Sequence, residues 1–175
     1  VWVGTGEPWT RNSVSVGQGI YKTTNGGETW ELKGLEKTER IGRIEIHPHN
    51  PDIVYVAALG HLWDAHEERG VYRTLDGGKS WERVLYKNEH TGCADLSIDP
   101  DNPDVLYAAM WNHRRWPHFF RSGGEGSGLY KSEDGGDSWV QLTNGLPADS
   151  VGRIAVDVSP ASPNMVYAVV EAKEN

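Results

Sequence analysis

Apolar and polar positions alternate over short stretches of the chain, which is the pattern of half-buried β-strands. The clearest case predicts four strands, A to D, near residues 44–47, 53–58, 70–74 and 80–85. Prolines separate A from B and a glycine pair separates C from D, as is typical of strand-connecting turns. No stretch shows the 3.6-residue period of an amphipathic helix. The pattern therefore predicts an all-β chain.

This four-strand pattern repeats along the sequence. A segment that begins with glycine and ends in Gly-Gly-x-Ser/Thr-Trp covers strand C and the turn into D, and it occurs at 19–30, 70–81 and 128–139. A second segment covers strands A and B around a proline turn, and it occurs at 44–58, 96–110 and 156–170. Four-stranded repeats with a period of about 40–50 residues are typical of β-propeller blades.

We therefore expect a β-propeller fragment of about three four-stranded antiparallel blades spanning residues 1–175. The expected units are an incomplete blade at 1–35, blades at 40–86 and 92–143, and the first half of a further blade at 152–170. The chain begins at Val1 without a methionine, which we interpret as a fragment. Closed propellers have about 4–8 blades, so the expected partners are further blades of the parent chain or a second copy.

The turn between strands C and D has a physical explanation. A carboxylate or amide there can accept hydrogen bonds from turn amides, and the paired glycines permit positive φ. The tryptophan that opens strand D is a large apolar group to bury between sheets. We expect these residues to be structural rather than catalytic: Asn25, Asp76, Asp134, Trp30, Trp81 and Trp139.

These segments resemble the Asp-box, or bacterial neuraminidase repeat (BNR), Ser/Thr-x-Asp-x-Gly-x-Thr/Ser-Trp. The first copy departs from it at Asn25. The chain looks most similar to bacterial glycosyl hydrolase-like proteins of the WD40-YVTN-BNR-like type, related to sortilin-type propellers and family 74 xyloglucanases. The resemblance implies a propeller and a secreted or periplasmic parent protein. It leaves the activity open, because the motif also occurs in sialidases, sorting receptors and photosystem assembly factors.

Composition excludes some classes of function. A net charge of −8 argues against a general nucleic-acid binder, which needs a basic surface. Cys93 is the single cysteine, so no internal disulfide forms, and no apolar run reaches the roughly 20 residues of a membrane span. The histidine pairs at 47 and 49 and at 61 and 66 lack a third ligand, so we expect no metal and no cofactor.

Propeller topology brings the B–C and D–A loops to one face, where long and varied loops carry function. The B–C loops are expected at 5–18, 59–69 and 111–127. Aromatic rings stack on sugars while charged groups bind hydroxyls or carboxylates. The candidate ligand-binding residues on these loops are Trp9, Arg11, His61, Trp63, His113, Arg114, Arg115 and Trp116. Arg43 and Arg153 are further candidates, expected where the inner A strands start, at the mouth of the central channel. Loop packing and ion pairs between blades are the structural alternatives.

The sequence thus predicts a binding or scaffold propeller that recognises a glycan or a peptide on this face. One alternative is a xyloglucanase- or sialidase-like glycoside hydrolase whose catalytic residues lie partly outside the chain. Such an enzyme needs two carboxylates about 5–10 Å apart, for which Asp95, Asp64 and Glu67 are the candidates. Another is a sortilin-like peptide-binding propeller. A sialidase needs three arginines that bind one carboxylate, and we do not identify this set in the sequence.

Overall fold

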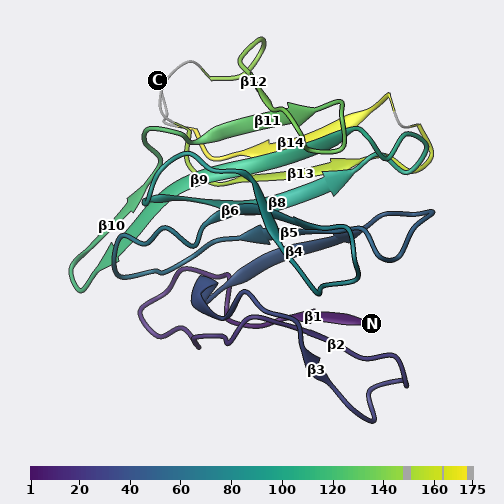
Figure 1. Cartoon of the computed structure of the whole chain (residues 1–175). Coiled ribbons are helices and arrows are strands. Elements are labelled where there is room, and N and C mark those ends of the chain that lie inside the picture. Colours follow the sequence, from purple (N-terminus) through teal and green to yellow (C-terminus); the bar gives the residue numbers. More distant parts are fainter. Residues whose placement is uncertain (148–150, 163, 173–175) are drawn as a thin grey trace.

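The structure is a computed structural model that describes residues 1–147, 151–162 and 164–172. Four antiparallel sheets follow one another along the chain, from the purple N-terminal sheet to the yellow C-terminal one (Figure 1). The all-β prediction is confirmed; the described residues add one short 3-10 helix, η1 (Glu36–Thr38). Pro163, in the third proline turn, lies outside the described residues.

The first, second and fourth sheets keep the order of their strands along the chain, whereas in the third sheet β9 pairs with β8, β10 and β11. The first contains β1 (Trp2–Gly4), β2 (Ile20–Lys22) and β3 (Glu31–Leu32). The second contains β4 (Ile41–Ile46), β5 (Val54–Ala58), β6 (Gly70–Thr74) and β7 (Glu82–Leu85). The third contains β8 (Thr91–Ile98), β9 (Leu106–Trp116), β10 (Phe119–Ser122), β11 (Gly128–Ser132) and β12 (Val140–Leu142), and the fourth β13 (Ile154–Val158) and β14 (Val166–Val170).

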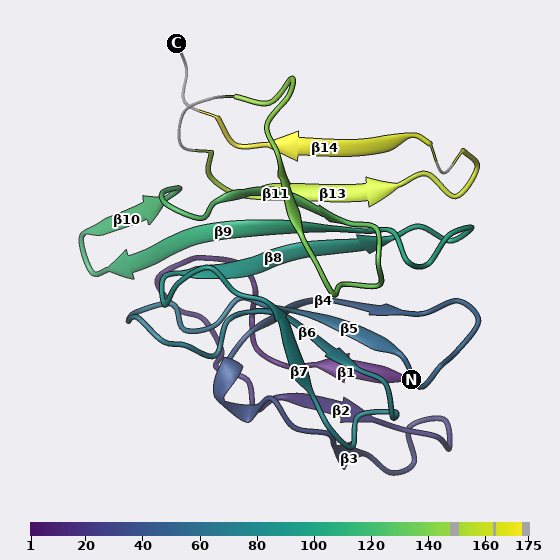
Figure 2. The same cartoon turned by 45° about the horizontal axis from the view of Figure 1, so that its top comes forward.

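The third sheet differs from the expected four strands. Residues 111–127 were expected to form a loop, yet β9 continues to Trp116 and turns back as β10, with Phe119 opposite Trp116 and Arg121 opposite Arg114. Both faces of this hairpin mix aromatic and charged residues, so no simple apolar–polar alternation marks it as a strand pair. The hairpin extends beyond the rest of the sheet (Figure 2).

The inner strands β8 and β13 are joined by side chains of β8. Asp95 Oδ2 accepts the amide of Val156 at 3.0 Å, and Ser97 Oγ accepts the amide of Val158 at 3.0 Å. The other carboxylate oxygen of Asp95 accepts the amide of Leu96 at 3.0 Å. Two adjacent sheets are thereby held in register through polar groups as well as through their apolar core.

Each C–D turn packs on the sheet that precedes it. Tyr55 Oη and Arg73 Nη1 of the second sheet both donate to the carbonyl of Gly135 at 2.8 Å, in the turn of the third sheet. Arg73 also pairs with Asp137 at 2.7 Å. One sheet therefore binds the backbone of the next sheet's turn.

The tryptophans of these turns follow the same rule. Trp81 donates to the carbonyl of Lys33 at 2.6 Å and meets Trp2 edge-on at 6.2 Å, both in the preceding part of the chain. Trp139 packs on the core of the second sheet. Trp30, in the first sheet of the chain, is 45% exposed. Burial of the turn tryptophan therefore depends on a preceding sheet.

Side chains within the turns accept hydrogen bonds from the amides of the same turns. Asp76 Oδ1 accepts the amides of Lys79 and Ser80 at 2.9 and 3.0 Å, and Oδ2 accepts the Ser80 hydroxyl at 2.6 Å. Gly78 has φ +86, and a Cβ there would lie 2.6 Å from the Trp2 ring, so only glycine fits. Asn25 accepts the Thr29 amide at 3.0 Å in the first turn.

Candidate ligand-binding face

Three segments from different sheets meet at the end of the molecule opposite the C–D turns. They are the loop 5–18, the loop 59–69 and the β9–β10 hairpin, and we call their common surface the loop face. Arg114 Nε donates to the carbonyl of Trp63 at 3.2 Å, and the Arg115 amide donates to Leu62 at 2.9 Å. The Arg115 side chain also reaches Asn12 in the first loop.

Aromatic side chains stand exposed on the loop face beside arginines. Trp9 is 68% exposed and Trp63 is 40% exposed. The guanidinium of Arg153 lies 5.0 Å from the Trp9 ring and 5.4 Å from the Trp111 ring, and that of Arg114 lies 4.7 Å from the Trp116 ring. Cation–π contacts of this kind hold the ring planes in place.

Two buried arginines support this surface from below. Arg69 donates to the carbonyls of Leu59, His61, Asp64 and His66 at 2.6–3.1 Å and so fixes the loop 59–69. Arg40 donates to the carbonyl of Gly60 at 2.7 Å. Burial lowers the pKa of each guanidinium to about 10, and a neighbouring arginine adds to the effect, Arg69 for Arg40 and Arg114 for Arg69. Backbone carbonyls accept from both groups, and the nearby carboxylates of Glu39 and Asp64 also favour the charged forms.

His113 is not where the sequence placed it. Its side chain is fully buried, stacked on Trp111 at 4.4 Å and 2.7 Å from Arg40 Nη2. The side chain therefore supports the face from within and does not contact a surface ligand. The extension of β9 through this residue is the physical reason, because it turns the side chain toward the interior.

The remaining predicted binding residues fall in different environments. His61 stacks on His66 at 3.8 Å and bonds Asp64 at 2.8 Å, close to Glu39 at 3.5 Å. Arg11 pairs with Glu7 within the first loop. Arg43 lies in the middle of β4, not on the loop face, where it pairs with Glu45 at 2.7 Å and approaches Asp157 of the fourth sheet at 4.0 Å.

The candidate catalytic carboxylates do not come together as one set. Both oxygens of Asp95 accept backbone amides on the inner strands. Asp64 and Glu67 lie on the loop 59–69, where Asp64 binds His61 and the carbonyl of Glu67 accepts from Arg83 at 2.5 Å. Among the described residues, no three histidine, cysteine, aspartate or glutamate side chains are grouped to hold a metal ion.

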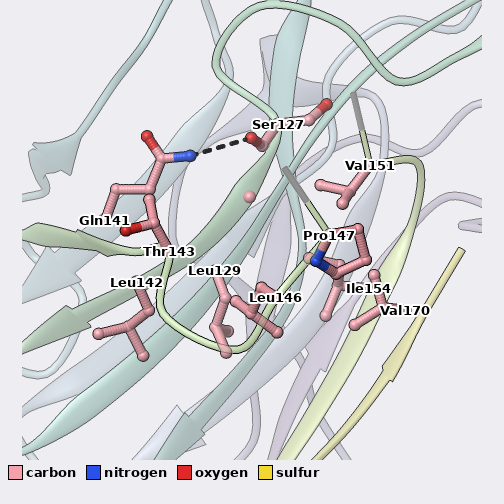
Figure 3. A pocket seen from close by; sticks show the side chains of 11 residues that line it. Ser127, Leu129, Gln141, Leu142, Thr143, Leu146, Pro147, Val151, Ile154 and Val170 are labelled. Atoms are coloured by element: carbon pink, nitrogen blue, oxygen red, sulfur yellow. Dashed lines mark hydrogen bonds between the residues drawn. The ribbon is translucent and has the colours of Figure 1, made fainter. Parts of the chain in front are cut away.

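Figure 3 shows an apolar cavity of about 300 Å³ between the third and fourth sheets. Leu129, Leu142, Leu146, Ile154 and Val170 point into it, and Gln141 Nε2 donates to the carbonyl of Ser127 at 3.4 Å at its edge. Most of these side chains belong to the apolar cluster that joins the two sheets. The cavity is therefore part of the packing between sheets.

A polar cleft of about 480 Å³ opens between the β7–β8 loop and the segment around β10. Sequence reasoning did not include it in the binding site. The signal was present, because the D–A loop reaches the same face as the B–C loops, but the predicted binding residues include none from the D–A loop at 86–90. Its lining residues are Tyr86, Asn88, Glu89, His90, Asn112, Arg121, Gly124 and Glu125.

The arrangement of sheets and turns is that of a blade-built β-propeller, of which this chain is a fragment. The chain belongs to the Sortilin-Vps10 family, since the model of that family, described as sortilin, neurotensin receptor 3, matches residues 18–175. Among the residues that the structure describes, no helix is long and apolar enough to cross a membrane.

Known relatives agree with this fold. A probable oligoxyloglucan-reducing end-specific xyloglucanase of Neosartorya fischeri is 29% identical over 123 residues, which cover 70% of this chain and 14% of that protein. An ancestral GH74 enzyme superposes with a TM-score of 0.68 at 23% identity, over 94% of this chain and 22% of that one. The GH74 xyloglucanase of Xanthomonas campestris gives 0.57 at 21% identity, over 97% and 27%.

Proposed function

We propose that this chain forms part of a glycan-binding propeller and that the loop face is its ligand surface. The observation that carries the proposal is the set of tryptophans on one face, with Trp9 and Trp63 exposed and Trp116 partly buried, each near an arginine. Sugar rings present apolar faces for stacking and hydroxyls for hydrogen bonds, so such a surface suits them. A secreted or periplasmic parent protein is part of this proposal.

The test is glycan binding by single tryptophan variants. Trp63→Ala and Trp116→Ala should each weaken binding to immobilised xyloglucan oligosaccharides and other plant and bacterial glycans, because a stacking surface is lost. Trp30→Ala is the matched control, since it removes an exposed indole at the opposite end of the molecule. Unchanged binding in both loop-face variants, with the fold intact by circular dichroism, would contradict the proposal.

A peptide ligand is the alternative that the family description supports, because its members include a neurotensin receptor by name. The same variants can be titrated with neurotensin and with unrelated peptides. Peptide binding that depends on Trp63, without glycan binding, would favour this alternative.

A glycoside hydrolase is the second candidate function, supported by the similarity to a xyloglucanase. Its catalytic carboxylates would lie partly outside this chain, since Asp95 is held by two backbone amides. Release of reducing sugar from xyloglucan by the parent protein, lost in Asp64→Asn or Glu67→Gln with binding retained, would establish it.

A further inference from the structure

Arginines that have no carboxylate partner are concentrated at the loop face. Three of the ten arginines, at positions 11, 43 and 73, pair with a carboxylate. The other seven have no carboxylate within 4.0 Å among the described residues, and they lie on or beneath the loop face: Arg40, Arg69, Arg83, Arg114, Arg115, Arg121 and Arg153. These guanidinium groups are therefore available to a ligand carboxylate without first breaking an ion pair within the described chain.

Of these seven arginines, Arg121 lines the polar cleft of about 480 Å³. Its Nε and Nη2 atoms are buried and have no hydrogen-bond partner in the described part of the chain. These two N–H groups lie on one edge of the guanidinium and form the fork that binds the two oxygens of a carboxylate. The Trp116 ring, 5.7 Å from Cζ, supports the guanidinium plane.

Two further unpartnered groups line the same cleft. Asn112 donates through Nδ2 to the carbonyl of Glu125 at 3.0 Å, so its unpartnered Oδ1 is an acceptor, suited to a hydroxyl. His90 Nδ1 is also buried without a partner among the described residues. Burial and the charge of Arg121 lower the pKa of His90, so its imidazole is neutral and offers a hydrogen bond rather than a charge.

The rim of the cleft limits the charge that a ligand can carry. Glu89 and Glu125 line it and are exposed. A polyanion would meet both carboxylates, whereas a ligand with one carboxylate and several hydroxyls can place its charge on Arg121 and its hydroxyls toward the rim. Tyr86 adds an aromatic ring to the lining.

We propose that this cleft binds a uronic acid residue of an acidic glycan, with the sugar carboxylate on the Nε–Nη2 edge of Arg121 and a neighbouring hydroxyl on Oδ1 of Asn112. The inference rests on the proposed glycan-binding function and assigns the class of sugar. The energetic basis is that buried polar groups without partners are costly, and this ligand would satisfy three of them together.

The test is calorimetric titration with three probes: an oligosaccharide that carries a single uronic acid residue, a neutral xyloglucan oligosaccharide and a hexapeptide of Asp and Glu. We expect the oligosaccharide with the uronic acid to bind most tightly. Arg121→Gln should weaken it at least tenfold, and Arg121→Lys should also weaken it because an ammonium lacks the fork. Lys79→Gln, which removes a charge in the turn of the second sheet at the opposite end, is the control and should change nothing.

A second variant, expected to bind more tightly, distinguishes a change in the binding site from a loss of folding. Glu125→Gln alters an exposed side chain and should tighten binding of the oligosaccharide with the uronic acid by removing a repelling charge. Unchanged affinity in both Arg121→Gln and Glu125→Gln would overturn the inference. Equal binding of the neutral oligosaccharide would overturn it but leave the proposed function standing, and equal binding of the peptide would overturn it in favour of a protein ligand. Absence of all glycan binding would contradict both.

Discussion

Arg40 Nη2 lies 2.7 Å from Nε2 of His113, and both side chains are fully buried. Because a guanidinium only donates, Nε2 of His113 must accept, and Nδ1 donates to the carbonyl of Trp111 at 3.2 Å. Burial and the charge of Arg40 lower the pKa of His113 well below its usual range. The imidazole is therefore neutral in the folded protein.

This neutral histidine predicts a loss of stability at mildly acidic pH. The unfolded chain protonates His113 near pH 6.5, whereas the folded chain does not. The stability that this group contributes is fully present above pH 6.5 and decreases as the pH falls toward the lower pKa of the folded state. His113→Gln should flatten the dependence of the melting temperature on pH between 7 and 5. The exposed His118→Gln variant is the control; an unchanged slope in His113→Gln would contradict the prediction.

Asp134 predicts a second effect at lower pH. The Ser138 hydroxyl and amide, followed by the Ser132 hydroxyl, lower its pKa to about 2. The unfolded pKa is about 3.9, so the stabilisation is present above that pH and is lost as the pH falls from about 4 to about 2. Asp134→Asn should reduce this acid sensitivity, measured by urea unfolding at pH 5 and pH 3. Identical changes in wild type and variant would count against it.

The first C–D turn has an asparagine, Asn25, at the position that Asp134 occupies in the third turn, and an asparagine side chain does not titrate. Asn25 makes the corresponding bond to the Thr29 amide and cannot lose a charge. Asn25→Asp should therefore increase the acid sensitivity, opposite to Asp134→Asn. The same sign in both variants would show that the turns do not act through the carboxylate charge.

Asp95 distinguishes a structural role from a catalytic one. Asp95→Ala leaves the Val156 amide without its acceptor, which should destabilise the chain by about 1–3 kcal/mol. Chemical unfolding measures the loss, with Asp101→Ala, an exposed residue of the following turn, as the control. Full stability together with loss of a glycosidase activity in the parent protein would reverse the assignment.

Exposed apolar groups on the outer sheets predict self-association of the isolated chain. Tyr167 and Val169 of β14 are 60% and 75% exposed, and Trp30 is also accessible. At roughly 25 cal/mol per Å² of apolar surface, covering such faces is strongly favourable. Light scattering should detect dimers or larger species at micromolar concentration. A monodisperse monomer that melts cooperatively above about 65 °C would refute this.

The sequence was sufficient for the fold because the repeats carry local structural signals. The glycine pairs and the carboxylates of the turns act within a few residues, so a single sequence displays them. The candidate site depends on contacts that the sequence does not display. His113 and Arg40 are separated by 73 positions, and the β9–β10 hairpin mixes residue types on both faces. The cleft around Arg121 likewise combines a D–A loop with the distant β9–β10 segment.

The second and third C–D turns each contact the sheet that precedes them in the chain, so the groups that receive a turn always come earlier in the sequence than the turn itself. Tyr55 and Arg73 precede their target Gly135 by 80 and 62 residues, and the carbonyl of Lys33 precedes Trp81 by 48. Because synthesis proceeds from the N-terminus, the sheet that a turn contacts leaves the ribosome before that turn does. Blades can therefore be added one at a time during synthesis, with each new hairpin stabilised as it emerges by a surface that has already folded.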